Sequence, residues 1–192
     1  MTMWSGWSVK MVTELPDMKE TGVMDAECLL TVTGDIALLN TFDKTFRSGF
    51  GPQWADRPGS PVPRYSLHAL FPVPEDVLRR GFSVAGRLWC ESYWETEGDL
   101  RDMQVKRVLG ERRYHFFVPG NPPVNFFRVV SRTYSNLEFR LSTFGRDEES
   151  WFGKFEDALH QYLFEGGAYT GSHSRDTKHA FAHLIKEMGF QS

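Results

Sequence analysis

Two histidines near the end of the chain have the spacing of a metal site. His179 and His183 are four residues apart, so on a helix they would share one face and could hold a metal ion. The intervening Ala-Phe-Ala lacks the glutamate that a zinc protease places there, and a metal site needs at least a third ligand. We therefore expect two solvated histidines, with no metal and no other cofactor.

The cysteines are the next candidates, because a thiolate beside a histidine is a nucleophile. Only Cys28 and Cys90 occur, and a pairing of Cys90 with His68 or His115 is conceivable. Cys90 follows Trp89 in an apolar block, however, which is typical of a buried structural thiol. The sequence has no Gly-x-Ser-x-Gly elbow, phosphate-binding glycine loop or dinucleotide fingerprint. We predict that the protein is not an enzyme; an unrecognised hydrolase remains a third alternative.

An acidic and aromatic block between residues 91 and 102 is the leading candidate for a binding surface. Five acids, one base and two aromatic side chains lie within it. Such a surface could compete with nucleic acid for a basic groove or anchor a protein interface. Trp94 is the preferred anchor, although a buried Trp94 among solvated acids is an equally simple reading. The predicted site comprises Glu91, Tyr93, Trp94, Glu95, Glu97, Asp99 and Asp102.

A basic block follows directly and suggests an alternative function. Two aromatic residues alternate on one face of a predicted strand, among four cations, as in a sheet on which bases stack. The Lys-Gly-Phe-Gly-Phe run of such sheets is absent, and the net charge of −3 with a pI of about 6.1 provides no general basic field. Single-stranded nucleic-acid binding is therefore the alternative, through Lys106, Arg107, Arg112, Arg113, Tyr114 and Phe116.

Alternation and helical spacing predict the elements that position these residues. We expect strands at residues 27–33, 65–71, 103–108, 112–118, 137–144 and 151–155. Helices are expected at 36–47 and 123–134, with a short helical turn at 75–80, and four prolines make residues 49–64 a loop. The residues predicted to be buried are Ile36, Leu39, Phe42, Phe126, Val130, Leu137, Phe139 and Leu141.

This order of elements predicts an α+β fold of the ferredoxin-like kind, a mainly antiparallel sheet with two helices on one face and an added C-terminal helix. A chain of 192 residues with 41% hydrophobic residues can bury such a core without disulfides. We divide it into an N-terminal arm at 1–24, the α+β domain at 25–157 and a C-terminal helical extension at 158–192. In that extension, Gly166-Gly167 and the polar run from Thr170 to Arg175 are interpreted as a linker.

Several blocks of the chain resemble the Api92-like family of phage and plasmid proteins. They are ECLLTVTGD, YSLHALFPVPEDV, WCESYWETEGDLRDMQV, PPVNFFRVVSRTYSNLEFRLSTF and WFGKF, which together cover about residues 25–157. In the Trp-rich block, Trp94, Thr96 and Asp99 match the family pattern, whereas its Asn, Gly, Lys and second Trp are missing. The resemblance implies a ferredoxin-like sandwich and an origin on a mobile element, but no defined activity.

Together these features predict a binding module rather than a catalyst. No run of about 18 apolar residues could span a membrane, and the first residues lack a secretory core, so we expect the cytoplasm of a host cell. The predicted partner is a host protein complex, and the specific hypothesis is inhibition of an antiviral defence system such as a CRISPR effector. Nucleic acid is the less favoured partner.

Overall fold

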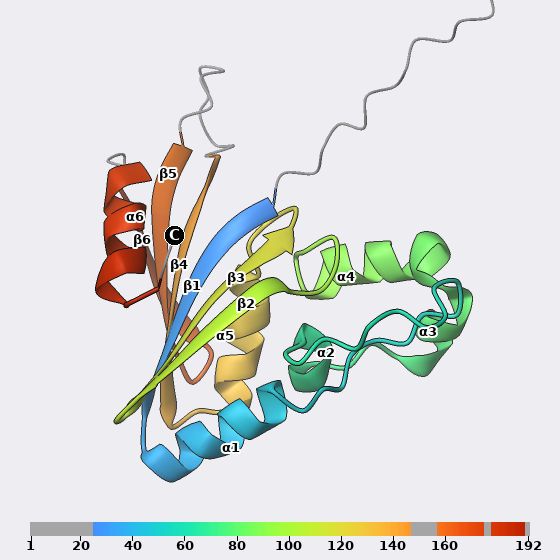
Figure 1. The fold of residues 1–192 in the computed structure, drawn as a ribbon, viewed down its shortest axis with the longest axis horizontal. Coiled ribbons are helices and arrows are strands. Elements are labelled where there is room, and N and C mark those ends of the chain that lie inside the picture. Colours follow the sequence, from blue (N-terminus) through green and yellow to red (C-terminus); the bar gives the residue numbers. More distant parts are fainter. Residues whose placement is uncertain (1–24, 147–156, 175–177, 191–192) are drawn as a thin grey trace, which may run out of the picture.

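The protein is an α+β fold built on one six-stranded antiparallel sheet (Figure 1). The computed structural model describes residues 25–146, 157–174 and 178–190; the predicted N-terminal arm and the strand at 151–155 lie outside them. The strands follow the spatial order β2-β3-β1-β4-β5-β6. They are β1 (Asp25–Gly34), β2 (Arg101–Val108), β3 (Glu111–Pro119), β4 (Leu137–Arg146), β5 (Asp157–Glu165) and β6 (Ala168–Ser174).

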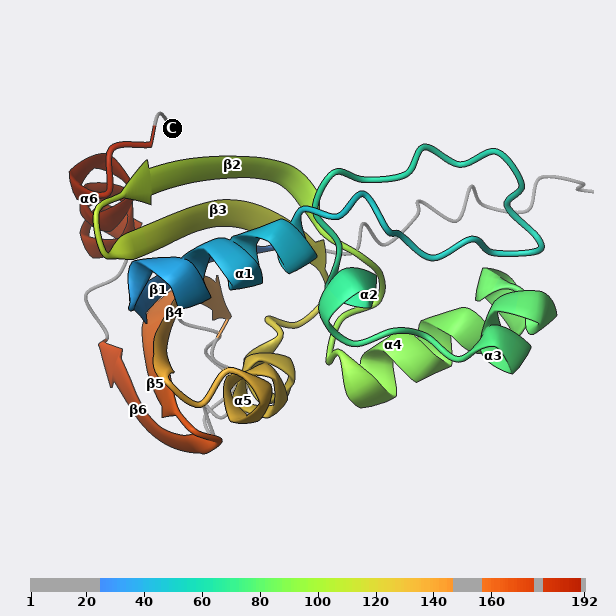
Figure 2. The same ribbon diagram turned by 90° about the horizontal axis from the view of Figure 1, so that it is seen from below.

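Helices cover both faces of the sheet (Figures 1 and 2). The long helices α1 (Ile36–Phe46) and α5 (Val124–Thr133) pack on one face, as predicted, and α6 (Lys178–Glu187) packs on the other. The central strand β1 is buried on both sides: Cys28 and Leu30 face the main core, whereas Leu29 faces α6. No helix within the described residues is long and apolar enough to cross a membrane.

Helix α1 illustrates how local sequence sets the first element. The Asp35 side chain accepts hydrogen bonds from the backbone N–H groups of Ala37 (2.8 Å) and Leu38 (3.2 Å), which fixes the start of the helix. Seven of the eight side chains predicted to be buried are buried, and Ile36 is the exception at 48% exposure. Ile36 is the first residue of α1 and lies where β1 ends, so the sheet does not cover it.

A helical insert of residues 47–100 separates α1 from β2 and projects to one side of the sheet (Figure 2). It contains α2 (Leu67–Leu70), α3 (Glu75–Arg80), and a π-helical segment (Phe82–Gly86) that continues into α4 (Arg87–Tyr93). The predicted strand at 65–71 is wrong. Ser66 caps a short helix there by accepting a hydrogen bond from the His68 amide, and the residues from Tyr65 to His68 are buried in succession, not alternately as in a strand with one buried face.

The Pro-rich loop at 49–64 has no helix or strand, as predicted, yet its side chains fix it to the insert. Trp54 is 8% exposed and packs edge-to-face on Phe82, with 5.2 Å between ring centroids. The Asp56 carboxylate accepts hydrogen bonds from the amides of Phe82 (2.7 Å) and Ser83 (2.9 Å). These bonds lower the pKa of Asp56 to about 2.

The residues from 158 onward do not form the purely helical extension that was expected. β5 pairs with β4 and β6 pairs with β5, so both strands belong to the main sheet. Gly166 and Gly167, predicted to begin a linker, form the tight turn between these strands, with φ values of 54° and 89°. The sequence did not indicate β6 because residues 168–174 are mostly polar. β6 is an edge strand, and it pairs with β5 alone.

Candidate binding cleft

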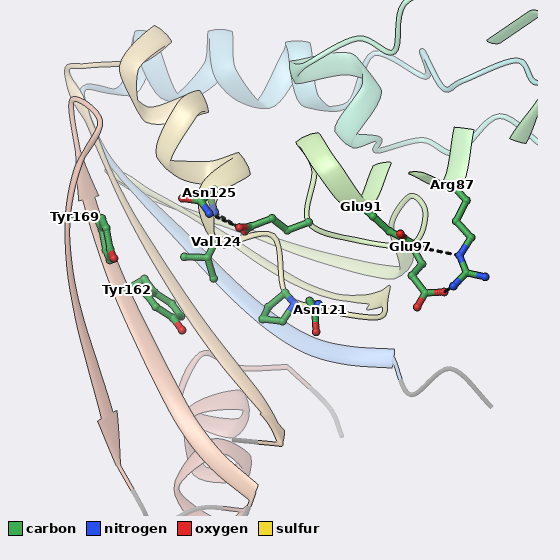
Figure 3. A pocket seen from close by; sticks show the side chains of 10 residues that line it. Arg87, Glu91, Glu97, Asn121, Val124, Asn125, Tyr162 and Tyr169 are labelled. Carbon is green, nitrogen blue, oxygen red and sulfur yellow. Dashed lines mark hydrogen bonds and ion pairs between the residues drawn. The ribbon is translucent and has the colours of Figure 1, made fainter. Parts of the chain in front are cut away.

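A cleft of about 800 Å³ lies where the helical insert meets the sheet (Figure 3). One wall comes from α4 and the loop after it, and the opposite wall comes from β5 and β6. The floor is the start of α5 with the residues just before it. The lining residues are Arg87, Glu91, Glu95, Glu97, Asn121, Pro122, Val124, Asn125, Tyr162 and Tyr169.

The insert contributes an acidic wall in which one guanidinium bridges two carboxylates. Nε of Arg87 donates to Oε1 of Glu91 at 2.8 Å, and Nη2 of Arg87 lies 3.1 Å from Oε2 of Glu97 (Figure 3). The hydrogen bond with Glu91 and the charges of both glutamates raise the pKa of Arg87. All three side chains remain partly exposed, so this is a solvated ion-pair network that salt screens.

Glu95 has a structural role in the same wall. Its carboxylate accepts hydrogen bonds from the backbone N–H of Asn125 (2.6 Å) and from the Asn125 side chain, at the first turn of α5. A negative charge here satisfies free amides and complements the helix dipole. Glu95 has a φ of 64°, a left-handed conformation that is unfavourable for a residue with a side chain. The α5 cap therefore holds the loop in a strained geometry.

Two tyrosines form the opposite wall, and the sequence interpretation missed them. Tyr162 of β5 is half-buried against the main core, and Tyr169 of β6 is 53% exposed (Figure 3). They lie on the same sheet face because Tyr162 pairs with Leu141 and Tyr169 pairs with Phe164, both core residues. The only local signal was alternation of Tyr162 with Phe164, and the cross-strand pairing that completes the wall cannot be read locally.

The loop that bears the acids is tied to the rest of the protein by its backbone. Thr96 forms an isolated bridge with Gly120, and the Glu97 amide donates to the Pro119 carbonyl at 2.8 Å. Gly120 has a φ of 81°, and a Cβ there would lie 2.9 Å from Cγ of Glu97. A glycine is required at that position both for the turn and for the close approach of Glu97.

Trp94, the predicted anchor, is not on the surface. It is fully buried, its indole N–H donates to the Phe71 carbonyl at 3.1 Å, and its ring packs edge-to-face on Phe126. The structural reading of this residue is therefore the right one, because the ring joins the insert to α5 inside the main core. In this conformation Trp94 cannot contact a partner.

Asp99 is also a structural carboxylate. It accepts hydrogen bonds from the Ser66 hydroxyl and from the amides of Leu67 (2.8 Å) and Leu100 (2.9 Å). Burial nevertheless outweighs these bonds and raises the pKa of Asp99. Asp102 is exposed at the β2 bulge with a φ of 51° and does not line the cleft. Of the five predicted acids, the cleft brings together Glu91, Glu95 and Glu97.

Tyr93 lies outside the cleft, at the exposed end of an aromatic ladder that is otherwise partly buried against the core. Its ring stacks on Trp89 with 4.8 Å between centroids, and Trp89 stacks on Phe71 at 5.9 Å. Tyr93 is 55% exposed and Leu88, on the same helix, is 66% exposed. Unlike Trp94, this tyrosine is accessible to a partner.

The predicted base-stacking surface is contradicted by burial. Tyr114 and Phe116 are fully buried beneath the helices, and the Tyr114 hydroxyl donates to Asp43 at 3.0 Å. Each of the four cations has a partner within the protein, although Lys106 and Arg107 are exposed. Arg107 binds Asp43, Arg112 binds Asn40 and two carbonyls, Arg113 binds Glu111, and Lys106 lies 5.7 Å from the centre of the Phe190 ring.

The thiols and histidines also behave as structural groups. Both cysteines are free and fully buried. Burial, with the charges of Asp99 and Glu91, raises the pKa of Cys90 to about 12, so it stays a thiol at neutral pH. Ring Nδ1 of His68 accepts a hydrogen bond from the Val73 amide at 3.0 Å. His183 is solvated beside Glu187, and the described residues contain no group of three metal-ligating side chains.

Fold and cleft together define the class: an α+β domain with one antiparallel sheet, a helical insert and an open acidic and aromatic cleft between them. No family model matches the sequence, and no curated protein matches it. The structure is similar to the crystal structure of a protein api92 from Yersinia pseudotuberculosis, described under the family model DUF1281. The TM-score is 0.55 at 9% sequence identity, and the match covers 79% of this chain and 98% of that chain. The Api92-like resemblance is therefore confirmed as a likeness of fold.

Proposed function

We propose that this chain is a protein-binding module that captures a positively charged segment of a partner in the cleft. The composition of the cleft carries this proposal. Three carboxylates against one guanidinium leave it net negative, and two tyrosine rings face them across the opening. Carboxylates attract a cationic segment and speed its encounter, while aromatic rings provide contact area and cation–π interactions. The proposal includes no catalytic step.

A second aromatic surface lies on another face of α4. Glu91 and Tyr93 are two residues apart on this helix and point to different faces, so only an occupant of the cleft that continues around α4 would meet Tyr93. Tyrosine is enriched at protein interfaces because its ring buries apolar area while its hydroxyl stays hydrated. Tyr93 therefore replaces Trp94 as the proposed aromatic anchor.

A charge reversal within the acidic wall tests the proposal. We would measure binding of a fluorescent peptide rich in Arg and Lys to the wild type and to a variant with Glu91→Lys and Glu97→Lys. Glu95 and Asp99 are unsuitable, because their carboxylates cap α5 and α2. We expect at least about tenfold weaker binding at low salt, with the difference shrinking as salt rises.

A matched control separates the cleft from overall charge. Glu138→Lys with Glu187→Lys makes the same change in net charge, and both residues form exposed ion pairs on the α6 side of the sheet. This control should bind as the wild type does, and all variants should keep similar thermal midpoints because solvated pairs contribute little stability. Equal weakening by both double variants, or no binding by the wild type, would refute the proposal.

The narrower form of the proposal names the partner. An antiviral complex of the host cytoplasm, such as a CRISPR effector, binds nucleic acid in a basic groove, and charge complementarity would let the acidic wall occupy it. Capture from host lysate should recover one protein complex with the wild type and lose it with the Glu91/Glu97 reversal. Recovery that disappears after nuclease treatment would overturn this form and favour nucleic-acid binding instead.

We also infer that the first four strands form a ferredoxin-like unit. The support is the element order β1-α1-β2-β3-α5-β4, once the insert is set aside, with the antiparallel neighbours β2-β3-β1-β4. β5, β6 and α6 are then additions to one edge and to the open face.

A further inference from the structure

The acidic wall already holds a cation, which is a side chain of the protein itself. Arg87 uses two different nitrogens for two different carboxylates: Nε for Glu91 at 2.8 Å and Nη2 for Glu97 at 3.1 Å (Figure 3). A planar guanidinium spans both acceptors at once, whereas a lysine ammonium is a single point of charge. The geometry of the wall is therefore that of a guanidinium site.

The opposite wall also accepts a guanidinium. Cζ of Arg128, on α5, lies 6.0 Å from the centre of the Tyr169 ring, at the outer limit of a cation–π contact. Tyr169 keeps 53% of its surface exposed, so much of the ring remains accessible from the cleft. Each wall therefore contacts a guanidinium of this same chain, Arg87 on the acidic side and Arg128 on the tyrosine side.

We propose that Arg87 is an internal stand-in for an arginine of the partner, and that binding exchanges one guanidinium for the other between Glu91 and Glu97. This inference rests on the proposed function and specifies its ligand as an arginine-bearing peptide segment. Glu91 and Glu97 then set the specificity, because two carboxylates placed to be spanned at once select a forked cation, and Arg87 lowers the affinity by competing for them.

The exchange is feasible because neither partner of Arg87 depends on it for position. Glu97 is fixed through its backbone, by the bond from its amide to Pro119 and by the neighbouring Thr96–Gly120 bridge. Glu91 lies within α4. The side chain of Arg87 is 56% exposed, and solvated ion pairs of this kind are weak, so it can swing into solvent at small cost.

Arg87→Gln tests the exchange with three labelled peptides of equal length that alternate glycine with arginine, lysine or citrulline. The wild type should prefer the arginine peptide over the lysine peptide and should not bind the neutral citrulline peptide. Arg87→Gln should tighten arginine-peptide binding about two- to fivefold, which corresponds to about 0.4–1 kcal/mol. Arg87→Lys keeps the charge but cannot span both acids, so its affinity for the arginine peptide should lie between those of the wild type and Arg87→Gln.

The matched control is Arg140→Gln. Arg140 also forms an exposed ion pair with a glutamate, Glu138, and 58% of its side chain is exposed. Its strand neighbours Phe139 and Leu141 face the core on the cleft side of the sheet, so Arg140 points to the other side. Arg140→Gln removes the same charge as Arg87→Gln and should leave the affinity for the arginine peptide unchanged. If Arg87→Gln has no effect or weakens binding, or if lysine binds equally well, the inference is wrong. If one of those results is obtained while the Glu91→Lys and Glu97→Lys reversal still abolishes binding, the inference is wrong but the proposed function stands. If no basic peptide binds, the proposed function is wrong as well.

Discussion

The contact between Trp54 and Gly86 should fix the acidic wall in place, and Gly86→Ala is the change that probes it. Gly86 lies in the helical run from Phe82 to Tyr93, with φ −64° and ψ −45°. The Trp54 ring lies directly on it: a Cβ at residue 86 would be 2.4 Å from Cζ3 and 2.7 Å from Cη2 of the ring. Because Arg87 follows immediately, any shift here moves the cleft.

Two opposing effects set the magnitude. Alanine is favoured over glycine in a helix by about 1 kcal/mol. The ring cannot stay where it is, however, and forcing an extra methyl into a packed contact typically costs about 1–3 kcal/mol. Complete expulsion of a tryptophan that buries about 150–250 Å² would cost about 4–6 kcal/mol, at about 25 cal/mol per Å². We expect a net loss of up to about 2 kcal/mol in the free energy of unfolding, because the helix preference for alanine offsets part of the packing cost and Trp54 can tilt before it leaves.

A double-mutant cycle measured by urea unfolding separates these effects. Trp54→Ala removes the obstacle, so in that background Gly86→Ala should raise stability by up to about 1 kcal/mol. The sign of the Gly86→Ala effect therefore reverses with the residue at position 54. Additive effects in the two backgrounds, within the usual error of about 0.5 kcal/mol, would refute the contact as the cause.

Two further predictions concern carboxylates that cap helices. Glu95→Ala should destabilise the protein by about 0.5–2 kcal/mol through loss of the α5 cap, and Asn125 amide exchange should accelerate more than exchange in α1; equal protection would contradict the cap. Because the folded pKa of Asp56 is lowered from 3.8 to about 2, its contribution to stability is present above about pH 4 and is lost as the pH falls through about 2. Exchange of the Phe82 and Ser83 amides, corrected for intrinsic rates, should speed up across that window in the wild type but not in Asp56→Asn.

Much of the framework was predictable because its signals are local. The Asp35 cap and the spacing of Leu39, Phe42 and Phe46 specify α1 within a dozen residues. Alternation predicted β1, β3 and β4, each of which buries a face against α1 and α5. The acidic block was recognisable by composition, and three of its glutamates do line the cleft.

What composition could not decide was which members of that block face solvent. Trp94 and Tyr93 are adjacent aromatics, yet one is buried against Phe126 and the other is 55% exposed. The difference is one of helix face: Trp94 keeps helical backbone angles and its amide donates to the Cys90 carbonyl, so it lies on the same buried face as Cys90, and Tyr93 lies on another face. Asp99 likewise reads as a solvated acid, and only the arrival of Ser66 and Leu67, more than thirty residues earlier in the chain, makes it a buried cap.

The chain by itself determined the hydrophobic periods, the caps and the charge of one wall, since each depends on neighbours a few residues away. Tertiary structure decided the other wall and hence the cleft. Tyr162 and Tyr169 face Glu91 and Glu97 only because β5 pairs with β4 and β6 with β5, contacts between segments without a shared local pattern. Strand pairing is non-local, and the polar sequence of an edge strand contains little signal of its partner, so the binding surface emerges only when the sheet is assembled.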